Sequence, residues 1–322
     1  MFVKQIESGN ELKQYESLVK QYGCVFNSIE WISIFSDQLL IMGVFNKDNK
    51  LVAAFLLYKT SMMGMPYISS PPYSPHNGFI VENKANNKSN EATYLKNILE
   101  TIADYFQKRK DAIFMTAFPH WLIDTQPFFW KNFKVIPNYT YRIDLTLSID
   151  QLSKNLAPDK RTSLKKVEKD GLRIEKCTDY SIVKELVLKS FSRKEKSLDT
   201  TLLDNILVDF AKPDNSFAFV AYDKQAPIAV TFCVFDDQTA YYLLGGYDSQ
   251  NKHQGAGVAT IWHALLYARE MGMQIFDFEG SMIPEVEKYF RKFGGNLVAY
   301  YTINKAWLPF ELLLKFKKRA LF

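Results

Sequence analysis

Residues 241–295 read YYLLGGYDSQNKHQGAGVATIWHALLYAREMGMQIFDFEGSMIPEVEKYFRKFGG and carry the clearest structural signal in the chain. The stretch predicts a strand, a glycine-containing loop, a long amphipathic helix, a second strand ending in acidic residues, and a short helix. Gly255 and Gly257 stand where the loop opens the helix, so unpaired backbone N–H groups would adjoin the positive end of the helix dipole. Because that combination binds phosphate or pyrophosphate, the sequence predicts a phosphate-bearing donor.

The composition is that of a globular chain of two ordinary domains. Of its 322 residues, 47% are hydrophobic and 15% aromatic, which allows a sizeable core. No apolar run approaches the ~20 residues of a membrane helix, and no secretory signal is visible in the first residues. We therefore expect a cytoplasmic protein without a transmembrane segment. Its three well-separated cysteines fit reduced thiols.

The sequence argues against two kinds of catalysis. It has no CxxC or HxxxH spacing, so no metal site is expected. It has four histidines and no GxSxG signature, so a hydrolase of the Ser/His/Asp type is not expected either.

The predicted elements form two α/β units in succession. In the second half, strands alternate with helices and end in the strand 274–278, the helix 284–293 and the strand 296–304. The first half repeats this plan loosely, but at 70–80 it reads SPPYSPHNGFI, whose three prolines cannot offer a run of N–H donors. We expect an α/β (α+β) chain of two tandem domains, each a mixed sheet flanked by helices. Residues 1–150 would lack a phosphate loop and residues 151–322 would have one.

Several segments resemble a known family. The loop reads K-x-x-G-x-G at 252–257, similar to the Q/R-x-x-G-x-G/A pyrophosphate loop of GNAT acyltransferases. In order and spacing, the chain also resembles the Fem family of aminoacyl and acyl transferases, which have two GNAT-like domains in tandem. That resemblance rests on TYRIDLTLSIDQL (140–152) followed by KNLAPDKRTSLKKVEKDGLRI (154–174), IFDFEGS (275–281) and YFRKFGGNLVAYYTI (289–303). It covers nearly the whole chain and implies the tandem GNAT fold.

The resemblance implies transfer of an acyl or aminoacyl group from a phosphate-bearing donor to an amine. Acyl-CoA and aminoacyl-tRNA are the donors it allows, with no metal. The acceptor would be the amine of a small molecule, a peptide or a sugar, with a cell-envelope precursor in cell wall biogenesis as one candidate. Two alternatives stay open: an acyl-CoA-dependent GNAT N-acyltransferase, and a non-catalytic module that binds a nucleotide or RNA, including tRNA.

Two carboxylates after the strand 274–278 are the first catalytic candidates. Asp277 and Glu279 alternate with phenylalanines, which predicts that both lie on one strand face beside the glycine-loop helix. One of them could accept the amine proton or orient the amine, and Glu279 at the strand tip is the preferred choice of the two. A solvated or helix-capping carboxylate is the plain alternative. Tyr289 is the third candidate, because GNAT enzymes often carry a general-acid tyrosine in the last helix. That position here is Phe290, one residue and about 100° of helix away, which favours the Fem-like interpretation.

The remaining candidate residues are expected to bind the donor or the substrate and not to take part in the reaction. The predicted phosphate cradle consists of Lys252, Gly255, Ala256, Gly257 and Val258. Substrate phosphates could also meet a basic helix near the domain junction or the last helix, where the candidates are Arg161, Lys165 and Arg291. A solvated charged helix face is the plain alternative for these three residues.

The C-terminal residues 307–322, WLPFELLLKFKKRALF, combine apolar and basic side chains. Such a segment can lie on an anionic membrane surface, whereas most amphipathic helices pack back on their own domain. The sequence allows peripheral membrane contact through this helix as well as internal packing.

Overall fold

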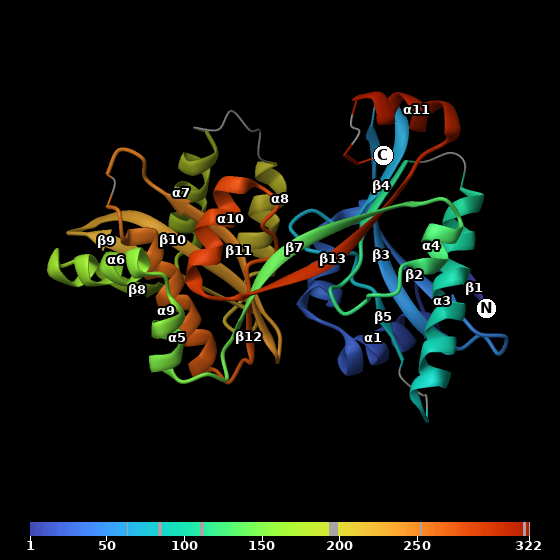
Figure 1. The fold of residues 1–322 in the computed structure, drawn as a ribbon, viewed down its shortest axis with the longest axis horizontal. Coiled ribbons are helices and arrows are strands. Elements are labelled where there is room, and N and C mark those ends of the chain that lie inside the picture. The colour runs from blue at the N-terminus through green and yellow to red at the C-terminus, as the bar shows by residue number, and fades with distance from the viewer. Residues whose placement is uncertain are drawn as a thin grey trace. The chain divides into compact units, whose positions relative to one another are not determined.

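The computed structural model describes residues 1–62, 64–82, 86–109, 113–192, 199–251, 253–317 and 320–321. The chain forms two compact units (Figure 1). Unit 1 consists of Met1–Asn138 and Ala299–Phe322, and unit 2 of Tyr139–Val298. Each unit is a mixed β-sheet with helices packed on it, as the sequence predicts.

The sheet of unit 1 has the strand order β1-β2-β3-β4-β6-β13, and β5 pairs with β3. Only β4 and β6 are parallel; the other pairs are antiparallel. The strands are β1 (Phe2–Ile6), β2 (Leu39–Phe45), β3 (Leu51–Met62), β4 (Met65–Ser69), β5 (Ile80–Val81), β6 (Ile113–Ala117) and β13 (Asn296–Lys305).

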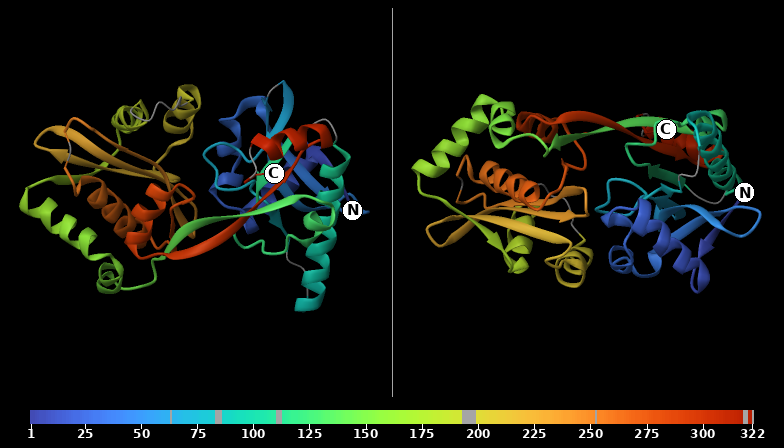
Figure 2. Two further views of the ribbon diagram at one scale, coloured as in Figure 1. Left: turned by 45° about the horizontal axis from the view of Figure 1, so that its top comes forward. Right: turned by 90° about the horizontal axis from the view of Figure 1, so that it is seen from below.

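Helices cover both faces of this sheet (Figure 2), with α3 on one face and α1 on the other. The helix α3 begins where the Asn87 side chain accepts a hydrogen bond from the Asn90 N–H, an N-cap that supplies one missing helical acceptor. The helices are α1 (Asn10–Tyr22), α2 (Ile29–Ser33), α3 (Lys88–Lys108), α4 (Gln126–Trp130) and α11 (Leu308–Lys317), with 3₁₀ turns η1 (Val25–Asn27) and η2 (Ser36–Gln38).

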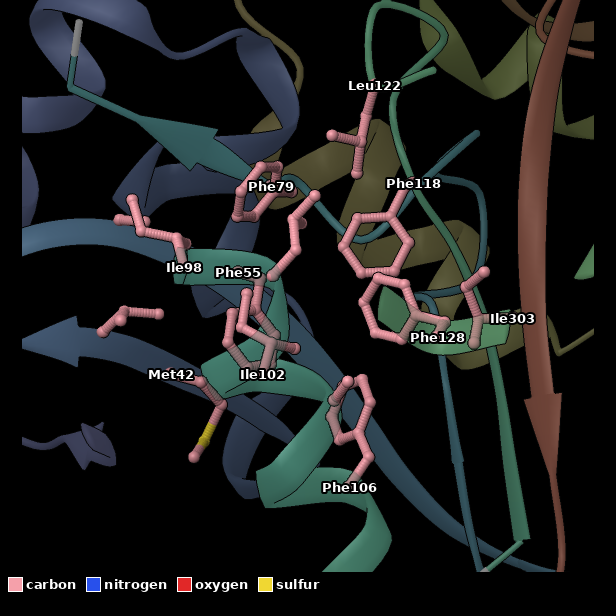
Figure 3. Close-up of a cluster of buried hydrophobic side chains, with 14 of the residues drawn as sticks. Met42, Phe55, Phe79, Ile98, Ile102, Phe106, Phe118, Leu122, Phe128 and Ile303 are labelled. Carbon is pink, nitrogen blue, oxygen red and sulfur yellow. The ribbon is translucent and has the colours of Figure 1, made fainter. Parts of the chain in front are cut away.

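Aromatic side chains fill the core between α3 and the sheet (Figure 3). Phe106 of α3 lies among Phe55, Phe114 and Phe128, with ring centroids 4.8–6.5 Å apart. Ile303 of β13 is fully buried in the same cluster. The C-terminal strand is therefore part of the core of unit 1.

The sheet of unit 2 has the order β7-β12-β11-β10-β9-β8. Only β11 and β12 are parallel. The strands are β7 (Lys134–Asp144), β8 (Arg173–Cys177), β9 (Ser216–Asp223), β10 (Ala226–Phe235), β11 (Thr239–Tyr247) and β12 (Ile275–Asp277).

In unit 2, α9 lies on one face of the sheet and α7 on the other (Figure 2). The apolar side of α9, which includes Val258, Ile261 and Leu265, is buried against the strands. The helices are α5 (Ile149–Asn155), α6 (Pro158–Lys169), α7 (Tyr180–Ser192), α8 (Thr200–Asp204), α9 (Ala256–Glu270) and α10 (Pro284–Phe290), with the π-helix η3 (Asn205–Phe210) and the 3₁₀ turn η4 (Arg291–Phe293).

The division of the chain differs from the contiguous one expected at residues 1–150 and 151–322. Residues 139–150 belong to unit 2, whereas 299–322 return to unit 1. The return has a physical cause: β13 pairs with β6, and Leu314 of α11 is buried against Ile113. The apolar burial that holds these C-terminal elements lies in unit 1.

Replacing Ile303 by Ala should destabilise the protein by about 2–5 kcal/mol, because it opens a cavity in the core of unit 1. The matched change Ile123→Ala, at an isoleucine of unit 1 that is 75% exposed, should cost less than about 1 kcal/mol. Urea unfolding followed by tryptophan fluorescence measures both, since four of the five tryptophans lie in unit 1. Equal losses in the two variants would contradict the assignment of β13 to that core.

Candidate active site

The candidate site lies in unit 2, where β11 and β12 stop pairing. Parallel pairing joins Thr239–Tyr241 to Ile275–Asp277 and ends there, while β11 continues to Tyr247. The register of β10 and β11 also shifts between Phe232 and Cys233, the sign of a β-bulge. One edge of β11 pairs with β10. Beyond Tyr241, the opposite edge therefore has no strand partner in the part of the chain that the structure describes.

Three groups contact the carboxylate of Asp277, the last residue of β12. Its Oδ2 lies 3.0 Å from Nε of Arg142, and its Oδ1 accepts hydrogen bonds from the Thr140 hydroxyl (2.7 Å) and the Glu279 N–H (2.8 Å). Arg142 stands directly opposite Asp277 in the β7–β12 register. Burial raises the pKa of Asp277, while Arg142 and Thr140 oppose that rise. The side chain is thus a structural anchor that holds the turn after β12.

Glu279 follows in a left-handed backbone conformation, with φ of +62°. A non-glycine residue there costs about 1–2 kcal/mol, and the hydrogen bond from its own N–H to Asp277 offsets part of that cost. The expectation that Asp277 and Glu279 share one strand face is wrong, because β12 ends at Asp277 and the chain turns before Glu279.

The Glu279 carboxyl is the unsatisfied group of the site. Its Oε1 is buried and has no hydrogen-bond partner among the described residues. Burial, and secondarily the charge of Asp277, raise the pKa of Glu279 well above its ordinary value. A half-buried carboxyl that has one buried oxygen without a partner and a raised pKa is typical of a group that exchanges a proton with a ligand.

Cys233, Tyr242 and Tyr289 are three further titratable side chains of unit 2 whose pKa values are raised by burial. Burial and the charge of Glu279 raise the pKa of the Cys233 thiol, and burial together with Tyr289 and Cys233 raises that of Tyr242. The Tyr242 hydroxyl lies over Gly245, where a β-carbon would stand 1.7 Å from it. Gly245 is therefore required for this placement of Tyr242.

The first turn of α9 offers fewer amides than the sequence predicts. The Gly255 N–H donates to His253 Nδ1 (3.2 Å) and the Ala256 N–H to the His253 carbonyl (3.2 Å). The first helical bond runs from the Ala259 N–H to Gly255, so the Gly257 and Val258 N–H groups have no acceptor within the described chain. Two of the four predicted cradle amides are thus available, and Lys252 lies outside the described residues.

The two glycines of this turn have different uses. A β-carbon on Gly255 would lie 2.6 Å from the Ser163 carbonyl oxygen, so glycine allows α6 to pack closely against α9. A β-carbon on Gly257 would meet only the Tyr289 hydroxyl, at 3.4 Å. Gly257 therefore leaves open space above the helix start, next to Tyr289.

Lys160 of α6 completes this end of the site. Its side chain is 4% exposed, and its Nζ lies 3.3 Å from the centroid of the Tyr289 ring and 4.7 Å from that of Phe293. Burial lowers the pKa of Lys160 to about 8. The structure thus brings a buried ammonium group to the tyrosine that adjoins Gly257.

The substrate-binding candidates occupy other positions. Arg161 donates from Nη1 to the carbonyl oxygens of Lys154 (3.0 Å) and Leu156, and so caps the end of α5. Lys165 is exposed, and Arg291 is an exposed residue paired with Glu287 at 3.5 Å. None of the three adjoins Glu279 or Gly257 through a described contact.

Sequence reasoning missed Arg142, Thr140, Tyr242 and Lys160. Lys160 could have been found, because it precedes Leu164 and Val167 by four and seven residues and so shares their inward helix face. Arg142 could not, since its pairing with Asp277 depends on the register of two strands more than a hundred residues apart in the chain.

Known protein families share this architecture. Residues 161–291 match the model of the acetyltransferase (GNAT) domain. A search of the curated proteins gave no match. The matched range includes β8 to β12, α9 and α10, whereas Arg142 and Lys160 precede it.

Solved structures are similar over nearly the whole chain. FemX is similar with a TM-score of 0.68 and 13% identity, over 97% of this chain and all of that one. The C-terminal domain of a putative lysylphosphatidylglycerol synthetase from Agrobacterium fabrum has a TM-score of 0.59 and 12% identity, over 94% of both chains. A tandem GNAT protein from the clavulanic acid biosynthesis pathway has a TM-score of 0.50 and 10% identity, over 94% of this chain and 98% of that one. The chain therefore has a Fem-like tandem GNAT fold, and its matched domain is of the acyltransferase class.

The described residues contain neither a candidate metal cluster nor a membrane-spanning helix. No group of three or more His, Cys, Asp or Glu side chains in them could hold a metal ion. None of their helices is both long and apolar enough to cross a membrane.

Replacing Arg142 by Met should destabilise the protein by about 3–5 kcal/mol, because it leaves the buried Asp277 carboxylate without its cation. The loss should grow as the pH rises, since Asp277 binds a proton more tightly in the folded variant than in the unfolded chain. The control Arg291→Met removes an exposed pair and should cost less than about 1 kcal/mol. Urea unfolding at acidic and neutral pH tests this, and a loss that is the same at both values would contradict it.

Proposed function

We propose that unit 2 transfers an acyl or aminoacyl group from a phosphate-bearing donor to an amine, with Glu279 as the general base. The observation that carries the proposal is the half-buried Glu279 carboxyl, whose Oε1 is buried and has no partner in the described chain. A carboxyl with a raised pKa is matched to an amine, which must lose a proton to become a nucleophile.

In the proposed reaction, the amine nitrogen attacks the carbonyl carbon of the donor while Glu279 accepts its proton. A C–N bond forms, and the C–S bond of a thioester or the C–O bond of an ester breaks. The leaving thiol or hydroxyl takes up a proton. The N–H groups on the unpaired edge of β11 after Tyr241 are suited to stabilise the intermediate oxyanion.

The donor phosphates would lie on the first turn of α9. The free N–H groups of Gly257 and Val258 and the helix dipole favour an anion there. Lys160 adds a buried positive charge beside Tyr289, and the open space above Gly257 admits the ligand. Tyr289 is proposed to contact the donor, and Asp277 to position Glu279.

The GNAT domain match favours acyl-CoA as the donor, and the likeness to FemX favours an aminoacyl donor such as aminoacyl-tRNA. The acceptor would be a small-molecule, peptide or sugar amine, with a cell-envelope precursor among the candidates. Both donors are cytoplasmic compounds, so we place the reaction in the cytoplasm. Unit 1 is proposed to be a GNAT-like domain without a donor site.

Replacing Glu279 by Gln should lower kcat by about 100-fold or more, because the amide cannot accept the amine proton. In the wild type, kcat should rise with pH through the raised pKa of Glu279, and this limb should vanish in the variant. Release of CoA from acetyl-CoA, or of deacylated tRNA from aminoacyl-tRNA, measures turnover with a panel of amines. Unchanged turnover would remove Glu279 from the mechanism.

The fold of this variant can be checked independently. Because burial raises the pKa of Glu279, the wild type loses folding stability as the pH rises above the ordinary pKa of a glutamate. The Glu279→Gln variant should therefore be at least as stable as the wild type, and its advantage should grow with pH. Glu285→Gln, an exposed change on α10, serves as the control for both turnover and stability.

Replacing Lys160 by Met should weaken donor binding about tenfold, because the site loses a buried positive charge. In the wild type, affinity should fall as the pH rises through about 8, where Lys160 loses its proton. The variant should lack that dependence, and Lys166→Met, an exposed change on α6, should bind as the wild type.

Calorimetric titration with acetyl-CoA and a longer acyl-CoA measures this, with Gly257→Trp as the blocked form. Binding that Gly257→Trp abolishes would support a CoA donor. If neither acyl-CoA binds, the same variants are tested with aminoacyl-tRNA. Equal affinity of Lys160→Met and wild type for the donor that binds would contradict the role of Lys160.

A further inference from the structure

The C-terminal helix α11 has one packed face and one bare face. Phe310 and Leu314 lie against Ile113 and Ala306 of unit 1, and Leu314 is fully buried. On the other side, Leu308 is 68% exposed, Leu312 61% and Phe316 92%. The predicted internal packing of the helix is thus real, but among the large apolar side chains of α11 it uses Phe310 and Leu314 and leaves Leu308, Leu312, Leu313 and Phe316 exposed.

The bare face is a continuous stripe. Leu308, Leu312 and Phe316 follow one another at intervals of four residues, so they stand in one row along α11. Trp307, directly before the helix, is also half-exposed. Isolated exposed apolar residues are ordinary, whereas a row of leucine and phenylalanine with a tryptophan at its end is typical of an interaction surface.

Positive charge accompanies the stripe. Lys315 lies on the helix, and the sequence continues with Lys317, Lys318 and Arg319. Glu311 is the one acidic residue in 307–322, and it pairs with Lys315 at 2.8 Å. The segment therefore combines an apolar row with a net positive charge.

A pocket of about 440 Å³ lies beside the start of α11. Arg109 and Lys305 supply cations to its lining, while Phe106, Trp307 and Leu308 supply apolar surface. The carboxylate of Glu311, which pairs with Lys315, also lines it. Lys305 Nζ donates a hydrogen bond to the Lys131 carbonyl (2.7 Å) and lies 4.5 Å over the Phe133 ring, so its position is defined. The pocket is suited to an anionic group attached to an apolar one.

We propose that α11 docks unit 1 on an anionic lipid membrane. Leu308, Leu312 and Phe316 would enter the boundary between headgroups and acyl chains, with Trp307 at headgroup level. Lys315 of the helix would meet anionic headgroups, and the pocket with Arg109 and Lys305 would accept a lipid phosphate.

The charge of the segment argues against a second copy of this chain as the occupant. Pairing two stripes would bring together two copies of a segment with four basic residues and one acidic residue, and the two net positive charges would repel each other. An anionic membrane satisfies both the apolar row and the positive charge.

The test is flotation of the full chain with vesicles, in the absence of acyl donors and amines. The protein should float with vesicles of phosphatidylcholine and phosphatidylglycerol and remain unbound with phosphatidylcholine alone. Replacing Leu312 and Phe316 together by Ser should reduce the bound fraction about tenfold. Both side chains are exposed, so thermal unfolding should not change.

Two further variants make the test specific. Val208→Ser replaces an apolar side chain in unit 2 that is 74% exposed, and it should bind vesicles as the wild type does. Lys317→Glu together with Lys318→Glu should abolish the preference for anionic vesicles, and added salt should weaken wild-type binding.

Three results would overturn the proposal. The first is no flotation with anionic vesicles, or equal flotation with neutral ones. The second is wild-type flotation of the Leu312→Ser, Phe316→Ser variant. The third is a dimer of the wild type in sedimentation analysis that this variant loses, since a second copy would then cover the stripe.

Discussion

The buried ion pair between Arg142 and Asp277 is the contact on which the site depends. It joins β7 to β12 at residues that stand opposite each other in the sheet. The same carboxylate receives the Thr140 hydroxyl and the N–H of Glu279, so its desolvation is balanced by one cation and two hydrogen bonds. This arrangement holds the left-handed turn that takes Glu279 off the strand and leaves one of its carboxyl oxygens buried without a partner.

The site has opposite charge at its two ends. Acidic groups gather after β12, and positive potential gathers at the start of α9, where helix dipole, free amides and Lys160 adjoin. The close approach of α6 to Gly255 is what places Lys160 there. An acyl transferase needs this separation, because its base meets the amine while the donor phosphates are held elsewhere.

The segment 70–80 of unit 1 and the loop before α9 of unit 2 use their backbone amides differently. In unit 1 the Asn77 N–H donates to the Ala117 carbonyl, the Gly78 N–H to His76 Nδ1, and the Phe79 N–H to the Asn77 side chain. These amides are consumed within the protein, so this loop offers no row of free donors. In unit 2 the use of two amides by His253 still leaves the Gly257 and Val258 N–H groups at the helix start.

The sequence by itself determined the order of elements, the two α/β units and the glycine turn that opens α9, because periodicity and turn chemistry depend on residues close together in the chain. It also named Glu279 as the preferred candidate for the base, which remains a proposal. It placed Glu279 on a strand face with Asp277, however, and it missed Lys160 and Arg142. The helix periodicity around Lys160 was there to be used, whereas tertiary structure alone decided the turn at Glu279 and the pairing of Arg142, and it returned 299–322 to unit 1. Burial, register and the pKa of a carboxyl depend on groups that are distant in sequence, so no local pattern contains them.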